Sequence, residues 1–131
     1  KTGHCSSNVL YKYVLDDQSV GAFAGRVLVR EGSQKTVSQE TNRNLCATKE
    51  ARMYTQPMLE IYADDVKCAH GSTVGQRGIS LDEAKFLLQF AFAAEVIDQI
   101  KVEPLRDRLH HLLEKRFRGE LNKCEGCKLC K

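Results

Sequence analysis

The sequence predicts a protein in two parts, a β-solenoid followed by a small α-helical domain. Strand-like segments follow one another from residue 9 to about residue 75, with turn residues between them and no helical pattern. After residue 76 the apolar residues recur with the helical period instead. We therefore assign residues 1–76 to the β part and residues 77–131 to a helical domain with a cysteine-rich tail.

The β part contains five strand-like segments. They cover residues 9–15, 20–30, 35–47, 51–63 and 66–75, and the turn signals between them are Asp16-Asp17, Glu31-Gly32-Ser33, Lys49-Glu50 and Asp64-Asp65. This spacing fits either a β-sandwich or a stacked solenoid. The polar stretch TVSQETNRN suits a sandwich core poorly, whereas a solenoid rung can expose one face and carry an asparagine at a corner. The sequence therefore favours the solenoid.

The first predicted helix begins at a capping box, in which Ser80 and Glu83 each satisfy a free backbone N–H. Its apolar residues form two adjacent rows that cover about half of the circumference, wider than the stripe of a typical surface helix. The rows are Phe86, Phe90, Ala93, Ile97 and Ile100, and beside them Leu87, Ala91 and Ala94. This width fits a helix packed between two neighbours, or a face that receives a partner protein through Phe86, Phe90 and Ile97.

The second predicted helix opens near Pro104 and closes before Gly119, the usual placement of proline and glycine at helix ends. Its apolar stripe is narrower and consists of Leu105, Leu109, Leu112, Leu113 and Phe117. His110 and His111 are adjacent and point about 100° apart on a helix. We therefore expect both to be surface residues rather than ligands of one metal ion.

The composition argues against several functional classes. Hydrophobic residues make up 42% of the chain, and no apolar run is long enough for a membrane span. A net charge of +3, with most Lys and Arg interleaved with Asp and Glu, gives little support to nucleic-acid binding. Phosphate-binding loops, G-x-S-x-G and H-E-x-x-H do not occur, so we expect no enzyme. The start in mid-pattern, KTGHCSS, lacks an initiator Met and the apolar core of a signal peptide, and it indicates a piece of a longer protein.

The six cysteines do not form a pattern of structural disulfides. Cys5, Cys46 and Cys68 occur singly in strand-like segments, whereas the other three crowd into the C-terminal KCEGCKLCK. Close C-x-x-C spacing without a secretory signal indicates a reducing compartment, so we expect a cytoplasmic protein. Cys124, Cys127 and Cys130 could ligate an iron–sulfur cluster or zinc, remain empty as reduced thiols, or exchange disulfides. The spacing leaves these alternatives open.

Cys68 and His70 form a second candidate site. Residues two apart on a strand project from the same face, so one metal ion or one cluster iron could contact both side chains. The alternative is that Cys68 is a small buried side chain and His70 a hydrogen-bonded one. Spacing alone does not decide between the two.

Three stretches of the chain resemble one known family. LEIYADDVKCAHGSTVGQ (residues 59–76), QKTVSQETNRNL (residues 34–45) and AFAAEVIDQI (residues 91–100) are similar to the SufB/SufD family of the SufBCD iron–sulfur cluster assembly complex. The stretch YADDVKCAHG favours the SufD branch over SufB. The resemblance covers nearly all of this chain and corresponds to the C-terminal portion of the family's usual length.

The resemblance implies a right-handed parallel β-helix, truncated at its N-terminal end, and a C-terminal helical domain. It further implies a scaffold rather than a catalyst. The end of the β-helix pairs with SufB, the helices dock on the SufC ATPase, and isolated chains can form a homodimer. His70 matches a position at the SufB interface where transient ligation of iron or a nascent cluster is proposed. Cys68 is a weaker candidate, and Asp64 and Asp65 become turn residues.

The chain departs from the family pattern in two places. Family members usually carry an acidic and aromatic stretch between the glutamine that matches Gln76 and the arginine that matches Arg77, so we expect a spatial gap there. The C-terminal cysteine triplet is not a general family feature. A zinc- or iron-binding interaction module that uses this triplet therefore remains the alternative function.

Overall fold

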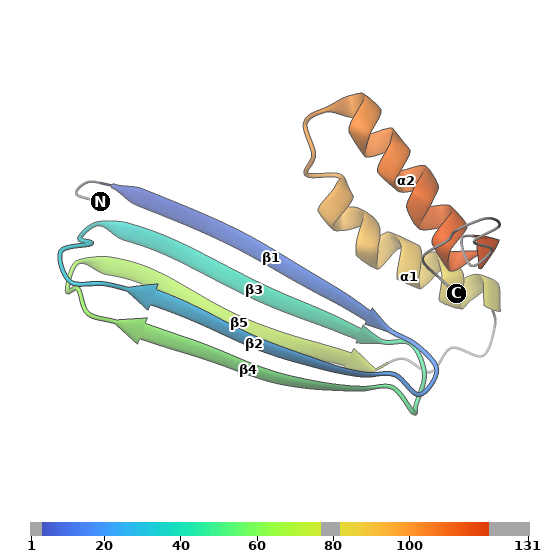
Figure 1. Ribbon diagram of the computed structural model, residues 1–131, viewed down its shortest axis with the longest axis horizontal. Coiled ribbons are helices and arrows are strands. Elements are labelled where there is room, and N and C mark those ends of the chain that lie inside the picture. Colours follow the sequence, from blue (N-terminus) through green and yellow to red (C-terminus); the bar gives the residue numbers. More distant parts are fainter. Residues whose placement is uncertain (1–3, 77–81, 121–131) are drawn as a thin grey trace, which may run out of the picture. The chain divides into compact units, whose positions relative to one another are not determined.

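The computed structural model describes residues 4–76 and 82–120 of the chain (Figure 1). The chain divides into two compact units, Lys1–Gly78 and Ile79–Lys131. Each unit is described by itself below.

Three sequence predictions fall outside the described ranges. They are the capping box that begins at Ser80, the gap between Gln76 and Arg77, and metal binding by the tail residues Cys124, Cys127 and Cys130. All three stay predictions.

The first unit consists of five strands, which confirms the five strand-like segments of the sequence. The turn signals also lie between strands as predicted, and Asp17 and Gly32 in two of these turns adopt positive φ angles of 50° and 74°. Before the last strand, the backbone N–H of Asp65 donates to Gln34 Oε1 (2.8 Å), which confirms a turn role for this aspartate. The strands are β1 (Cys5–Leu15), β2 (Val20–Val29), β3 (Thr36–Cys46), β4 (Arg52–Ile61) and β5 (Val66–Gln76).

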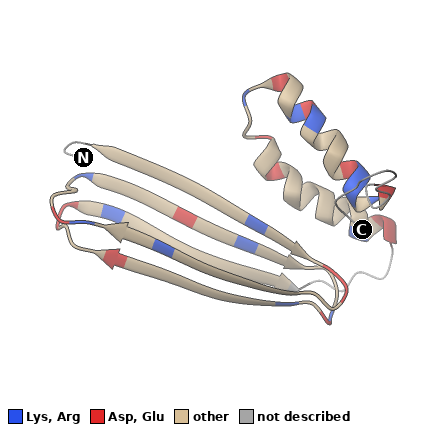
Figure 2. Ribbon diagram, in the orientation of Figure 1, with Lys and Arg blue, Asp and Glu red and all other residues tan. Residues whose placement is uncertain are grey.

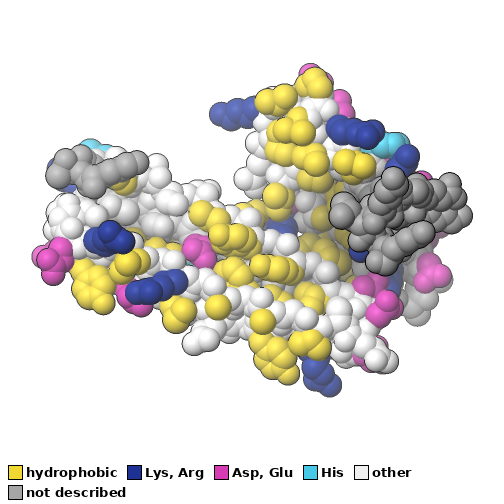
Figure 3. Space-filling model, viewed as in Figure 1, with side chains coloured by type: hydrophobic (Ala, Val, Ile, Leu, Met, Phe, Trp, Pro, Cys, Tyr) yellow, Lys and Arg dark blue, Asp and Glu magenta, His cyan; other side chains and the backbone are white. Residues whose placement is uncertain are grey.

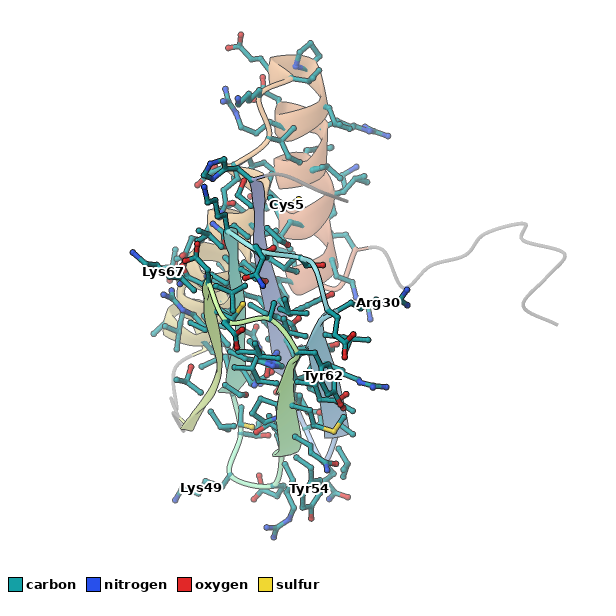
Figure 4. The ribbon with its side chains drawn as sticks, turned by 90° about the vertical axis from the view of Figure 1, so that its left-hand side faces the viewer. Cys5, Arg30, Lys49, Tyr54, Tyr62 and Lys67 are labelled. Carbon is teal, nitrogen blue, oxygen red and sulfur yellow. The ribbon has the colours of Figure 1, made fainter. Side chains whose placement is uncertain are left out.

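Successive strands alternate between two parallel sheets. One sheet has the order β1-β3-β5 and the other contains β2 and β4, with every pair parallel. Viewed from the end at which β1 begins, the two sheets face each other with side chains between them (Figure 4). This parallel arrangement differs from the antiparallel pairing of a typical β-sandwich and is compatible with the predicted β-helix.

The space between the sheets changes from apolar to polar along the strands. Near the end of β1 and β3, Leu15, Cys46 and Ala51 form a small buried apolar cluster, against which Met53 packs. The same face of β3 becomes polar toward the start of the strand, because alternate residues share a face. Its side chains there are Asn44, Asn42, Glu40, Ser38 and Thr36.

Asn42 and Asn44 are buried in the middle of β3, with only 0% and 3% of each residue exposed. Asn42 Oδ1 accepts hydrogen bonds from Asn44 Nδ2 (2.5 Å) and from Ser72 Oγ of β5 (2.7 Å). Asn44 Nδ2 also donates to the backbone carbonyl of Thr73 (3.1 Å). A solenoid rung can carry an asparagine at a corner, but these two amides face the interior and bind the neighbouring strand.

Charged residues are sparse along the strands and more frequent at the turns and on the second helix (Figure 2). One pair bridges the second sheet, where Arg26 of β2 and Glu60 of β4 lie 2.7 Å apart. The hydrogen bond from Arg26 to Glu60, and then the negative charge of that carboxylate, raise the pKa of Arg26 further above its ordinary value.

The second unit consists of two helices, α1 (Asp82–Ile97) and α2 (Glu103–Phe117). Pro104 lies in the first turn of α2, and Gly119 after its end has a positive φ of 76°, which confirms the predicted bounds of this helix. Ile100 does not extend the apolar row of α1, because the helix ends three residues earlier. Neither of these helices is long and apolar enough to cross a membrane, within the residues that the structure describes.

Aromatic and basic side chains hold the two helices together. Phe90 of α1 stacks on Phe86 and on His110 of α2, with ring centroids 5.9 and 5.8 Å apart. His110 Nε2 also lies 2.8 Å from Asp98 Oδ1, just after α1. His111 is exposed as predicted, and His110 is partly exposed because it also takes part in the helix–helix contact.

We expect Asn42→Ala to lower the free energy of unfolding by about 1–3 kcal/mol, because the partly buried hydroxyl of Ser72 loses its acceptor. Gln39→Ala, an exposed position on the opposite face of β3, is the matched control and should change it by less than about 0.5 kcal/mol. Urea unfolding followed by circular dichroism measures both. Equal effects of the two substitutions would contradict a stabilising role for the amide network.

Candidate functional site

His70 lies inside the first unit rather than on its surface. Its side chain is 2% exposed, and the strand register places it directly opposite Glu40 of β3. The Glu40 side chain is also largely buried, at 12% exposure. Residues that pair in register project from the same face of a sheet, so the imidazole and the carboxylate meet between the two sheets.

The Nδ1 atom of His70 connects the two sheets. It lies 3.0 Å from the backbone carbonyl oxygen of Met58 on β4. A carbonyl oxygen only accepts hydrogen bonds, so Nδ1 is the donor and carries a proton. Among the described strands β4 has a hydrogen-bonded neighbour on one side only, and His70 thus satisfies a carbonyl at the end of the stack.

The Nε2 atom of His70 faces the carboxylate of Glu40. Nε2 and Oε1 lie 3.1 Å apart, which is close enough for an ion pair when the imidazole is protonated. The contact does not have the direction of a hydrogen bond. Within the described residues Nε2 therefore has no hydrogen-bond partner. A ligand atom of the imidazole and one of the carboxylate therefore face each other in a buried space.

Two residues of β2 shape the space around this pair. The Phe23 ring meets the His70 imidazole edge to face, at a centroid distance of 6.4 Å and an interplanar angle of 89°. Gly25 lies where the Glu40 carboxylate needs room, and a Cβ atom there would collide with Oε1 of Glu40 and approach the Phe23 ring to 2.6 Å. The absence of a side chain at Gly25 therefore permits the position of the carboxylate.

Cys68 occupies the layer next to His70. It pairs in register with Ser38, is partly buried and has no disulfide partner, as is also true of the partly buried Cys5 and the buried Cys46. No group of three or more His, Cys, Asp or Glu side chains in the described ranges is arranged to hold a metal ion. The described residues therefore supply two adjacent ligand atoms, from His70 and Glu40, but not a complete metal site.

A cavity of about 340 Å³ lies at the end of the strand unit where β1 begins, and it reaches the side chain of Glu40. Its lining includes Cys5, Ser7, Ser38 and Glu40, so hydroxyl and thiol groups precede the carboxylate along the interior. The cavity thus gives access to the carboxylate of Glu40.

Apolar side chains gather on the face of the strand unit that is seen in Figure 3. The largest exposed set belongs to the edge strand β4 and the residue after it: Tyr54, Met58, Leu59, Ile61 and Tyr62, each between 37% and 64% exposed. An apolar strand with an unpaired edge is a common binding surface for another chain.

The helical unit has its own groove, with a volume of about 480 Å³. Its lining includes Phe86, the half-exposed Leu87 and Phe117, with Arg118 over the Phe86 ring at 4.7 Å. Of the predicted partner face, Phe90 contacts His110 of α2, Phe86 contacts Arg118 just after α2, and Ile97 is partly buried. The partner role of this face stays a prediction.

The sequence reasoning missed Glu40 as a site residue. It lies 30 positions before His70 in a polar stretch that resembles a solvated strand face. The polar residues run without interruption from position 38 to position 44, so no alternation in the sequence marks one face as the interior. Only the register of β3 against β5 shows that this face is the interior.

Parallel strands that alternate between two sheets, with a buried histidine–carboxylate pair between them and two helices after them, define a stacked parallel-strand scaffold. Residues 1–92 match the sequence profile of the SUF system FeS cluster assembly, SufBD core domain. The chain therefore belongs to the SufBD family of iron–sulfur cluster assembly proteins.

Individual relatives agree with this assignment. The chain is 40% identical over 117 residues to an iron–sulfur cluster assembly SufBD family protein of Synechocystis, covering 81% of this chain and 26% of the relative. It is 38% identical over 128 residues to the iron–sulfur cluster assembly protein SufD of Escherichia coli, covering 89% and 30%. The chloroplastic protein ABCI7 of Arabidopsis thaliana is 32% identical over 115 residues, covering 79% and 24%. The chain thus spans less than a third of the length of these relatives.

We expect Gly25→Ala to lower the free energy of unfolding by about 1–3 kcal/mol, because the new methyl group displaces Glu40 and Phe23. Gly71→Ala is the matched control, since a Cβ atom there has no neighbour within 4 Å. Chemical unfolding measures the stability of both variants, and the NMR signals of the His70 ring report the displacement. A Gly25→Ala protein with unchanged stability and unchanged His70 signals would show that the carboxylate does not depend on this glycine.

Proposed function

We propose that this chain is part of a non-catalytic, cytoplasmic scaffold subunit that acts in iron–sulfur cluster assembly. Membership of the SufBD family supports the process, and the alternation of parallel strands between two sheets supports a β-helix, right-handed as the resemblance implies. The observation that carries the proposal is the position of His70. It lies in β5, the last of the described strands, beside the edge of β4 with which no described strand pairs, where a second chain could complete both the sheet and the site.

The partner at this edge is SufB in our proposal. Leu59, Ile61 and Tyr62 expose apolar surface on and just after β4, and the free backbone groups of an edge strand can pair with a strand of another chain. In the absence of SufB, the same edge would allow a second copy to bind and form a homodimer.

The helical unit would dock on the SufC ATPase. The groove between the start of α1 and the end of α2 combines an apolar floor, Phe86, Leu87 and Phe117, with the charged residues Glu83, Arg118 and Glu120. Such a combination of an apolar centre and a charged rim is typical of protein interfaces. ATP hydrolysis would belong to SufC and not to this chain.

Iron or a nascent cluster would be cargo of the assembled complex rather than a resident cofactor. His70 is the first candidate ligand, because its Nε2 atom makes no hydrogen bond and its Nδ1 atom is held by a carbonyl oxygen. Cys68 is the weaker candidate, because it lies one layer away from the Glu40–His70 pair.

We expect the chain to retain SufB from Escherichia coli in a pull-down, and Leu59→Asp to reduce the retained amount at least tenfold by placing a charge in the apolar edge. Val37→Asp introduces the same charge at an exposed position on β3, whose two edges are both paired, and it serves as the control. Quantitative immunoblotting measures the retained SufB. Equal retention by all three proteins would exclude β4 as the docking edge.

The alternative function is a metal-binding interaction module that uses Cys124, Cys127 and Cys130. The C-x-x-C-x-x-C spacing favours it, since three thiolates at this spacing suit zinc or an iron–sulfur cluster.

If the tail binds metal, we expect anaerobically purified protein to contain stoichiometric zinc or iron. Substitution of Cys124, Cys127 and Cys130 by serine should remove it. Elemental analysis measures the metal, and the visible spectrum separates an iron–sulfur chromophore from zinc. Metal content that survives the triple substitution would assign the metal elsewhere in the chain.

A further inference from the structure

Glu40 is singled out neither by the sequence motifs nor by the family assignment. Its carboxylate and the His70 imidazole are the two ligand-type groups that meet inside the strand unit. The hydrogen bond at Nδ1 determines the tautomer of His70. Because Nδ1 donates its proton to the Met58 carbonyl, Nε2 is the atom whose lone pair is available. Metal-ligating histidines are usually held in this way, with the second ring nitrogen donating to a carbonyl or carboxylate.

The Nε2 atom of His70 lies against Oε1 of Glu40. Both atoms carry lone pairs in the neutral imidazole and the ionised carboxylate, and they are 3.1 Å apart in a buried space. Such a contact is repulsive unless a positive charge lies between the two atoms. The distance also suits two ligands of one ion, because bonds of about 2.1 Å that meet at about 95° place a nitrogen and an oxygen about 3.1 Å apart.

The strand pairing and the neighbouring residues hold Glu40 and His70 in place. Glu40 and His70 stand opposite each other on paired strands, and Gly25 leaves the space that the carboxylate fills. Phe23 forms one wall of the imidazole site. Ligands on rigid strands with fixed neighbours keep their geometry more closely than ligands on loops. The cavity that Glu40 lines gives access to its carboxylate from the end of the strand unit where β1 begins.

We propose that Glu40 is a second protein ligand beside His70, so that Nε2 and Oε1 form a half-site for a divalent first-row metal ion. Mixed imidazole and carboxylate ligation suits ferrous iron and zinc. The choice of iron as the natural occupant rests on the proposed assembly function. The half-site itself does not, and it can be tested on this chain without any partner.

The test uses the full chain with Cys124, Cys127 and Cys130 replaced by serine, so that the tail thiols do not capture the probe. Isothermal titration calorimetry with Co²⁺ under anaerobic conditions measures the affinity of this parent protein. We expect Glu40→Gln, which keeps the volume of the side chain, to weaken Co²⁺ binding at least about tenfold, and His70→Ala to weaken it further. Glu60→Gln removes a carboxylate from the ion pair with Arg26 and should leave the affinity unchanged.

A second measurement identifies the ligand atom. Zn²⁺ added to nitrogen-15-labelled parent protein should shift the Nε2 resonance of His70 and leave Nδ1 protonated, and in the Glu40→Gln protein the same shift should require more Zn²⁺. Parent-like Co²⁺ affinity of Glu40→Gln would overturn the proposal, as would Zn²⁺ coordination at Nδ1. Lack of Co²⁺ binding by the parent would also overturn the proposal. It would mean that a proton, and not a metal ion, lies between the two atoms.

The outcome is independent of the pull-down with SufB. Loss of the Co²⁺ half-site with intact SufB retention would remove Glu40 as a ligand and leave the scaffold function standing. Co²⁺ binding without SufB retention would do the reverse.

Discussion

The parallel, in-register pairing of β3 with both β1 and β5 is the constraint on which the rest of the strand unit depends. It places Glu40 opposite His70 and Asn42 opposite Ser72 on the same interior face. A slip of one residue would turn every one of these side chains to the other face, because side chains alternate along a strand. The same pairing therefore determines both the interior hydrogen bonds and the geometry of the candidate site.

The polar interior also makes this register specific. Asn42 is fully buried and accepts hydrogen bonds from Asn44 and from Ser72 of the neighbouring strand. A buried amide without such partners costs free energy, so other registers of β5 are disfavoured. The Glu40 carboxylate lies on the same interior face, opposite His70, and Gly25 provides the room for their contact.

His70 has two roles that use different ring atoms. Nδ1 ties β5 to the Met58 carbonyl of β4, whereas Nε2 faces Glu40. The hydrogen-bonded histidine that the sequence offered as the alternative to a ligand is thus present in the structure, and it is not in conflict with ligation. A hydrogen bond at one nitrogen orients the other nitrogen for a metal ion. The edge of β4 nearby is apolar and exposed, which joins the proposed cargo site to the proposed partner surface.

The sequence by itself determined the local elements. Alternating segments with turn residues between them predicted all five strands, and Pro104 and Gly119 predicted the second helix, because these signals act over a few residues. The stretch around His70 pointed to the family and to one of the two paired residues. The inward position of the β3 asparagines was not predicted and Glu40 was overlooked, since composition alone does not distinguish an inward polar face from a solvated one.

Only the tertiary structure decided which polar residues meet. Glu40 and His70 are separated by 30 positions in the sequence, and Met58 and Gly25 reach them from the opposite sheet. These contacts depend on the order and register of parallel strands that are far apart in the chain, whereas strand and turn propensities are local. The sequence therefore determined where the strands and helices are. The order and register of the strands determined that Glu40 lies beside His70.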